Sequence, residues 1–270
     1  MAFCKNCGKE LPSNARFCPS CGAPVGEPVS APAENRRSFE VGPKPRVVVA
    51  SFVPGRIEVK AATEGKVEVS LNLRRPEDMD WSVYQQGDLI MVTFRNSSRT
   101  YWSWAAHPDS GPTADVSLSV PPACDLDLEN RLDRVSITGV SGVIAVNSAI
   151  ASVYATGCGG NLKLRTKTGS IFMEGVDGVV SAETATGQVK FSGSLGGADN
   201  FFRTSVGTIE ISLKGTPDLT VEAHSGIGAV VSTLPLADAR GDDRRVHGRL
   251  GSGTGHLRAE TSTGSIRIGP

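Results

Sequence analysis

One six-residue phrase, Thr-x-Thr-Gly-x-(Ile/Val), returns at a nearly fixed step through the second half of this 270-residue chain. Its copies begin at Thr166, Thr184, Thr204 and Thr261, with a degraded copy at His224. The copies' glycines are separated by 18, 20, 19 and 38 residues and lie at Gly169, Gly187, Gly207, Gly226 and Gly264. A period near 19 residues with short strands and small turn residues is typical of a β-solenoid, in which each period forms one coil.

The repeat also predicts how the coils stack. Glycine would recur because a turn with positive φ lies at the same place in every coil, and Thr or Ser would form ladders along the axis. The double step before Gly264 indicates an inserted loop at residues 236–249. A β-sandwich of regular hairpins is the alternative, and it would show alternating turn types instead of one phrase. The expected internal apolar row is Ile171, Val189, Ile209, Ile227 and Ile266.

Strand-like runs extend this domain back to Arg46. They are rich in Val, Ile, Leu and Thr and are separated by Gly, Pro, Asn or Asp. A weaker series at a step of 18, residues 135–139 and 153–157, continues the array. Residues 46–270 are therefore expected to form a mainly β, right-handed β-solenoid or β-helix-like domain, with repeats clearest in 131–270. The expected strands before the repeat are 46–52, 56–60, 66–73, 89–94, 115–120 and 125–129, with a weak helix or a loop at 75–82.

Two CxxC pairs near the N-terminus predict a metal site formed by Cys4, Cys7, Cys18 and Cys21. Thiolates three positions apart can share one Zn²⁺, and two such pairs complete a tetrahedral site. Four protein ligands leave no position for water or substrate, so a single structural zinc ion is expected. A segment of about 26 residues buries too little surface to fold without such help.

Disulfides of a secreted mini-domain and a redox CxxC are the alternatives for these cysteines. No apolar signal segment precedes Cys4, and a redox motif would not need a second matching pair. We therefore expect a zinc ribbon at residues 1–26. The proline-rich residues that follow, 27–45, are expected to be a flexible linker.

Two resemblances accompany these patterns. Residues 3–8 (Phe-Cys-Lys-Asn-Cys-Gly) and 17–24 (Phe-Cys-Pro-Ser-Cys-Gly-Ala-Pro) resemble the short prokaryotic Cys₄ zinc ribbons, which often serve as interaction or tethering pieces. The Thr-x-Thr-Gly repeat resembles the bacterial putative-adhesin family of β-strand-repeat proteins, over residues 46–270. That second resemblance implies a solenoid-like body and brings no catalytic residues.

Net charge and the length of the apolar runs argue against nucleic-acid-binding and membrane-spanning proteins. The chain has 28 basic and 28 acidic residues, so its zero net charge argues against nucleic acid or an anionic membrane as a general partner. No apolar run approaches the 18 or more residues of a membrane helix, and we expect a cytoplasmic protein.

The remaining chemistry-bearing residues predict no catalytic or cofactor-binding site. The four histidines have no spacing that suggests a triad or a metal site, and Cys124 and Cys158 are expected to be buried thiols. The charged cluster 242–245 is expected to be a solvated loop. A carbohydrate-active enzyme built on the β-helix is the alternative, and Asp242 and Asp243 are the residues whose mutation would test it.

The aromatic segment from Tyr101 to Trp104 has two interpretations, a cap over one end of the solenoid or a binding patch. At the other end the chain stops inside a repeat at residues 265–270, which suggests end-to-end self-association. The sequence thus predicts a non-enzymatic, zinc-binding interaction or scaffold protein with an unidentified protein partner. A nucleic-acid-associated zinc ribbon protein is a further alternative.

Overall fold

A computed structural model describes residues 2–3, 9–11, 35–62, 65–97, 111–215 and 217–270. The chain divides into two compact units, residues 1–34 and 35–270. In the first unit β1 (Ala2–Phe3) pairs antiparallel with β2 (Glu10–Leu11). Both cysteine pairs lie outside the described residues. The described part of the chain contains no helix long and apolar enough to span a membrane.

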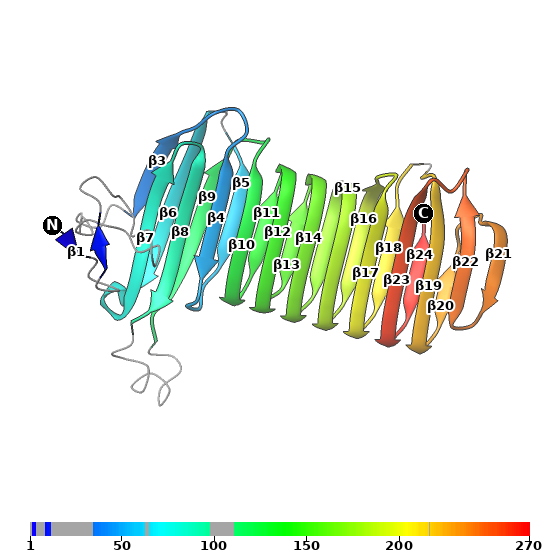
Figure 1. Cartoon of the computed structure of the whole chain (residues 1–270). Coiled ribbons are helices and arrows are strands. Elements are labelled where there is room, and N and C mark those ends of the chain that lie inside the picture. The colour runs from blue at the N-terminus through cyan, green and yellow to red at the C-terminus, as the bar shows by residue number, and fades with distance from the viewer. Residues whose placement is uncertain (1, 4–8, 12–34, 63–64, 98–110, 216) are drawn as a thin grey trace. The chain divides into compact units, whose positions relative to one another are not determined.

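The second unit is mainly β, as predicted, and its strands form two long ladders (Figure 1). In spatial order the first ladder contains β7 (Met79–Gln86), β8 (Leu89–Asn96), β4 (Arg46–Ser51), β10 (Asp125–Leu132), β12 (Ser141–Ile150), β14 (Gly159–Thr168), the end of β15 (Ile171–Thr186), β17 (Asp199–Val206), β23 (Gly255–Thr263), β19 (Leu219–Ile227), β22 (Arg245–Leu250) and β21 (Ala237–Asp242).

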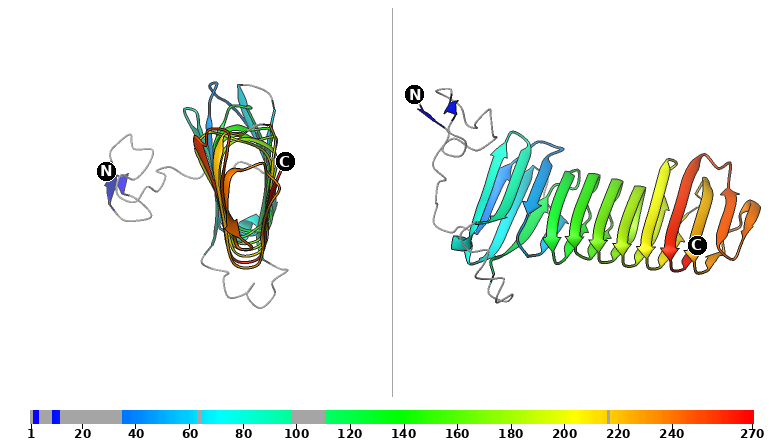
Figure 2. Two further views of the ribbon diagram at one scale, coloured as in Figure 1. Left: turned by 90° about the vertical axis from the view of Figure 1, so that its right-hand side faces the viewer. Right: turned by 60° about the horizontal axis from the view of Figure 1, so that its bottom comes forward.

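The second ladder starts with the antiparallel strands β3 and β6 and then becomes parallel. Its order is β3 (Arg36–Glu40), β6 (Lys66–Arg74), β9 (Thr113–Val120), β5 (Ile57–Ala61), β11 (Val135–Thr138), β13 (Val153–Thr156), the start of β15, β16 (Val189–Leu195), β18 (Ile209–Leu213), β24 (Ile266–Gly269) and β20 (Val230–Ser232). A single 3₁₀ turn, η1 (Pro76–Asp78), precedes β7, where the sequence left a helix or a loop open. Viewed along the stack, successive coils superpose (Figure 2).

Neighbouring parallel strands are in register at the sequence period. Ile144 pairs with Leu162 and Leu162 with Val180, each 18 residues later. A buried apolar row runs through the second ladder because each strand places the same inward position beside its neighbour. This row consists of Val116, Ile57, Val135, Val153, Ile171, Val189, Ile209, Ile266 and Val230.

The predicted internal row was wrong at one position. Ile227 is 67% exposed, and Val230, 6% exposed, pairs with Ile266 in its place. The error came from aligning Gly226 with the repeat glycine, whereas Ser225 is the residue that pairs with Thr261. The corner glycine of this coil is therefore Gly228, which has a φ of 134°.

Chain order is broken near both ends of the body. The last strands in sequence, β23 and β24, lie between β17–β18 and β19–β20. At the other end β4 and β5 lie between β8–β9 and β10–β11. The coil formed by the last residues is thus internal and paired on both sides, so the premise for end-to-end association, an exposed final repeat, was wrong.

The residues expected to be an inserted loop, 236–249, form most of the hairpin β21–β22, which pairs antiparallel with β19. Leu234, Leu236 and Val246 pack against the core there, so the hairpin covers apolar surface at this end. Its outer strand β21 is exposed at every residue and contains Asp238 and Arg240. Charged side chains on an exposed edge strand disfavour pairing with another sheet.

The strand-forming body begins earlier than predicted. β3 lies inside residues 27–45, the segment expected to be a linker, and pairs with β6 through five residue pairs. Arg37 of β3 donates to the Val83 carbonyl of β7 at 2.8 Å, which links the first strands of the two ladders. The aromatic segment 101–104 lies outside the described residues.

Candidate functional site

The turn that follows each strand of the first ladder, here called the corner, explains the repeat phrase. The first Thr of the phrase is buried and donates its hydroxyl hydrogen to a corner carbonyl of the preceding coil. Thr184 donates to Gly169 at 2.9 Å and Thr204 to Gly187 at 3.0 Å. These hydroxyls satisfy carbonyls that the corner would otherwise bury without a partner.

The glycine of the phrase is required because the next coil approaches too closely for a side chain. A Cβ placed on Gly187, whose φ is 149°, would lie 2.1 Å from the Gly169 carbonyl oxygen. At Gly264 the corresponding distance to the Gly207 oxygen is 1.8 Å. Threonine and glycine therefore act on the same carbonyl, one by bonding it and the other by leaving room for it.

The second Thr position of the phrase faces solvent. Paired residues at this position form what we call the edge row, which is exposed in every coil. Four of its members are large and apolar, with exposures of 38% for Leu132, 53% for Ile150, 51% for Val206 and 67% for Ile227. The full edge row is Leu132, Ile150, Thr168, Thr186, Val206, Thr263 and Ile227.

Charged side chains gather instead on the broad outer surfaces of the ladders, where they pair between coils. Arg165 binds Glu183 at 2.6 Å, and Glu210 is contacted by Arg267 at 3.4 Å and Lys190 at 3.6 Å. These pairs are largely exposed, so each contributes only about 0–1 kcal/mol. Glu183 and Glu210 are thus partners in ion pairs between coils.

The two predicted buried thiols are confirmed. Cys124 and Cys158 are free, and their residues are 0% and 2% exposed. Burial raises the pKa of Cys124 to about 12 from an ordinary value of 9.0, with the Asp125 charge as the second cause. Burial also raises the pKa of Cys158. A thiol held protonated at neutral pH is a poor nucleophile, which fits a packing role.

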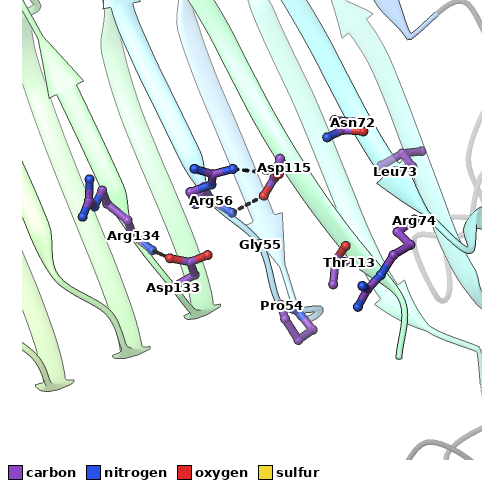
Figure 3. Close-up of a pocket in the computed structure, with 10 residues that line it drawn as sticks. All are labelled: Pro54, Gly55, Arg56, Asn72, Leu73, Arg74, Thr113, Asp115, Asp133 and Arg134. Atoms are coloured by element: carbon purple, nitrogen blue, oxygen red, sulfur yellow. Dashed lines mark hydrogen bonds and ion pairs between the residues drawn. The ribbon is translucent and has the colours of Figure 1, made fainter. Parts of the chain in front are cut away.

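The corner contains a groove between the ends of β5, β6 and β9 and the turn from β10 to β11, which we call the corner groove (Figure 3). Its volume is about 660 Å³. It is lined by Pro54, Gly55, Arg56, Asn72, Leu73, Arg74, Thr113, Asp115, Asp133 and Arg134. No sequence pattern indicated this site, because its residues come from four separate segments.

Asp242 and Asp243, the residues named for the enzyme alternative, are exposed. Asp242 accepts a hydrogen bond from the Arg244 amide at 2.8 Å in the exposed turn of the β21–β22 hairpin. His247 lies 3.8 Å from Glu222 on the neighbouring strand, an exposed contact. Among the described residues, no group of three or more His, Cys, Asp or Glu side chains is arranged to hold a metal ion.

Comparisons with known proteins add the following. The search of curated proteins finds no match. The chain is 9% identical in sequence to a putative cell adhesion protein from Clostridium sporogenes ATCC 15579, whose crystal structure is known. The two structures align with a TM-score of 0.35 over 87% of this chain and 98% of that one. A putative adhesin from Bacteroides fragilis NCTC 9343 is 11% identical, with a TM-score of 0.36, over 86% and 95%. Likeness at this level carries no conclusion about what the present chain binds.

A family match at the N-terminus rests on sequence instead of structure, and it covers both cysteine pairs. Residues 3–25 match the zinc-ribbon domain family. Cys4, Cys7, Cys18 and Cys21 all lie within this segment. The chain therefore begins with a zinc-ribbon domain, which is followed in sequence by a mainly β body.

Proposed function

We propose that this chain is a non-enzymatic, zinc-binding interaction protein of the cytoplasm, whose body is a right-handed β-solenoid. The observation that carries the proposal is the edge row. Its side chains are solvent-exposed and uncharged in seven successive coils, about 4.8 Å apart, with large apolar residues at four positions and threonine at the other three. Exposed apolar residues scattered singly need no explanation, but an uncharged row that contains several of them suits contact with a partner.

The edge row suits a protein partner better than a charged polymer. None of its seven members carries a charge, and the charges of the body are paired on the broad surfaces instead. Six of the seven members are β-branched, and such stiff side chains lose little conformational entropy on binding. An extended partner segment with apolar side chains would match it.

Site-specific photo-crosslinking in the native cells tests this surface. A crosslinking residue at Val206 or Ile150 should give the same discrete protein adduct. The matched control is Arg203, which lies on the same strand as Val206 but on the broad surface. Adducts of equal yield from Arg203, or none from either edge-row position, would contradict the proposal.

The zinc ribbon supports a second part of the proposal, one structural Zn²⁺ bound by Cys4, Cys7, Cys18 and Cys21. A closed tetrathiolate site would stabilise the N-terminal domain without supplying catalysis. Elemental analysis of the purified protein should give one equivalent of zinc, which the double variant Cys18→Ser, Cys21→Ser loses while the β circular dichroism signal of the body remains. Zinc-free protein with these thiols paired as disulfides would contradict both the metal site and the cytoplasmic location.

A further inference from the structure

The corner groove is where the repeat phrase is abandoned. In the coil that lines it and in the next coil along the axis, the buried Thr is replaced by Asn130 and Ser148, and the corner Gly by Asp133 and Ala151. Asp133 adopts a φ of 86°, which is strained for a residue with a side chain. Departures from an otherwise consistent pattern concentrate at functional sites.

Buried polar atoms beneath the groove wall are also left without partners. Asn130, 2% exposed, donates from Nδ2 to the Gly55 carbonyl of the wall at 3.2 Å, but its Oδ1 has no hydrogen-bond partner. The adjacent Ser148 Oγ has none either. In the Thr–Gly coils the equivalent hydroxyls of Thr184 and Thr204 are bonded. Asn130 thus keeps the bond to the corner carbonyl but has an unpaired Oδ1, whereas Ser148 in the next coil makes no such bond.

The groove has a mixed set of charged groups. Three arginines and two aspartates line it, which leaves a net charge of +1. Asp115 is held by Arg56, whose backbone amide donates to Oδ1 at 2.9 Å and whose guanidinium donates to Oδ2 at 3.4 Å. Asp133 Oδ1 accepts from the Arg134 amide at 2.7 Å. Each carboxylate is fixed in place and keeps an exposed side toward solvent.

Arg134 is the arginine at the outer end of the groove, and its guanidinium is directed away from Arg56, toward the next coil (Figure 3). Its guanidinium lies 4.9 Å over the Tyr154 ring, which stacks on Phe172 at 5.1 Å. No carboxylate among the described residues forms an ion pair with it. The aromatic pair orients the guanidinium without neutralising its charge. Figure 3 shows the Arg56–Asp115 pair between Arg134 and Arg74.

We propose that the corner groove binds an acidic polysaccharide, through a uronic acid whose carboxylate lies at Arg134 and through the sugars next to it. Arg134 would bind the carboxylate in the bidentate geometry that a guanidinium favours. Asp133 would bind ring hydroxyls of the same sugar. Asp115, Thr113 and Asn72 lie two to three strand spacings of about 4.8 Å away, on β9 and β6, and would bind hydroxyls of the neighbouring sugars. A simple anion would gain nothing from the two aspartates, and an apolar ligand would leave these polar groups unpaired. The volume lies within the usual range of ligand sites.

This site is independent of the protein contact proposed for the edge row. Titration calorimetry with the full chain tests it, using glucuronic acid, a galacturonic acid oligomer, the matching neutral sugars, and acetate as a plain anion. We expect the galacturonic acid oligomer to bind at least about 10-fold more tightly than its neutral counterpart, glucuronic acid or acetate. Equal binding of the glucuronic acid monomer would contradict the extended site, because one sugar cannot reach from Arg134 to Asn72.

Two variants make the test specific. Arg134→Gln removes the charge at an exposed position and should weaken uronic acid binding at least about 10-fold with the melting temperature unchanged. Arg203→Gln removes an exposed arginine outside the groove and should leave binding unaltered. Equal losses in both variants, equal binding of acetate, or no uronic acid binding at millimolar concentration would overturn the proposal.

Discussion

The same corner is built in two ways along the body. Around Thr184 a buried hydroxyl and a glycine enclose one carbonyl, and the hydroxyl is bonded. Beside the corner groove, Asn130 and Asp133 occupy these positions, and a buried oxygen lacks a partner. Both versions keep the parallel register, so the ladder itself tolerates either. The difference teaches that the repeat phrase stabilises the corner but is not required for the parallel register.

The largest effect should come from filling the space that the glycine leaves. Gly187→Ala puts a Cβ 2.1 Å from the Gly169 carbonyl, and the neighbouring coil must move to accept it. Together with the strain of its positive φ, we expect a loss of roughly 3–5 kcal/mol in the free energy of unfolding, measured by urea denaturation. The control is Gly157→Ala, because Gly157 has a φ of 60° but nothing within 4 Å of an added Cβ. It should cost only about 1–2 kcal/mol. Equal losses would show that φ, and not coil contact, explains the glycine.

Alkaline pH should act on the body through its buried thiols. The unfolded chain releases the Cys124 proton above pH 9, whereas burial raises the pKa of the folded-state thiol to about 12. This contribution is fully present below pH 9 and is lost as the pH rises, by about 1.4 kcal/mol per pH unit. Urea denaturation of wild type and Cys124→Ala between pH 8 and 11 should show a shallower decline for the variant. Parallel pH profiles would mean that the thiol is not protected from ionisation.

Removing the buried hydroxyl should have a smaller effect. Thr184→Val keeps the shape of the side chain but leaves the Gly169 carbonyl without its donor, which should cost about 1–2 kcal/mol. The control Thr186→Val lies two residues away in the exposed edge row and should change stability by less than about 0.5 kcal/mol. If the two variants unfold at the same denaturant concentration, the hydrogen bond contributes nothing measurable.

The smallest effect compares one substitution in the two kinds of coil. Ser225 donates to the Gly264 carbonyl at 2.8 Å, so Ser225→Ala should cost about 1 kcal/mol. Ser148 occupies the same row without a partner, and Ser148→Ala should be within about 0.5 kcal/mol of wild type. Thermal unfolding of both variants measures the difference. A larger loss at Ser148 would indicate that its hydroxyl has a partner, such as a bound water, in the protein.

Much of the fold could be predicted because the repeat acts locally. Expected strands such as 66–73 and 89–94 correspond closely to β6 and β8, since alternation and turn residues define them without reference to the rest of the chain. The alignment failed at residues 225–228, Ser-Gly-Ile-Gly, because either glycine satisfies the phrase. Only the pairing of Ser225 with Thr261 distinguishes them.

The sequence by itself determined the zinc-ribbon segment, the β-rich body, the period of its coils and the need for glycine at the corner, because each follows from residues close together in the chain. The tertiary structure decided the order of the coils. It placed β23–β24 between coils that precede them in sequence and built the corner groove from four distant segments. Parallel pairing between any two similar coils has a similar free energy, so the repeat alone does not fix which coils become neighbours. The hairpin β21–β22 pairs with β19 and covers apolar residues, which fits the position of the β19–β20 coil at the end.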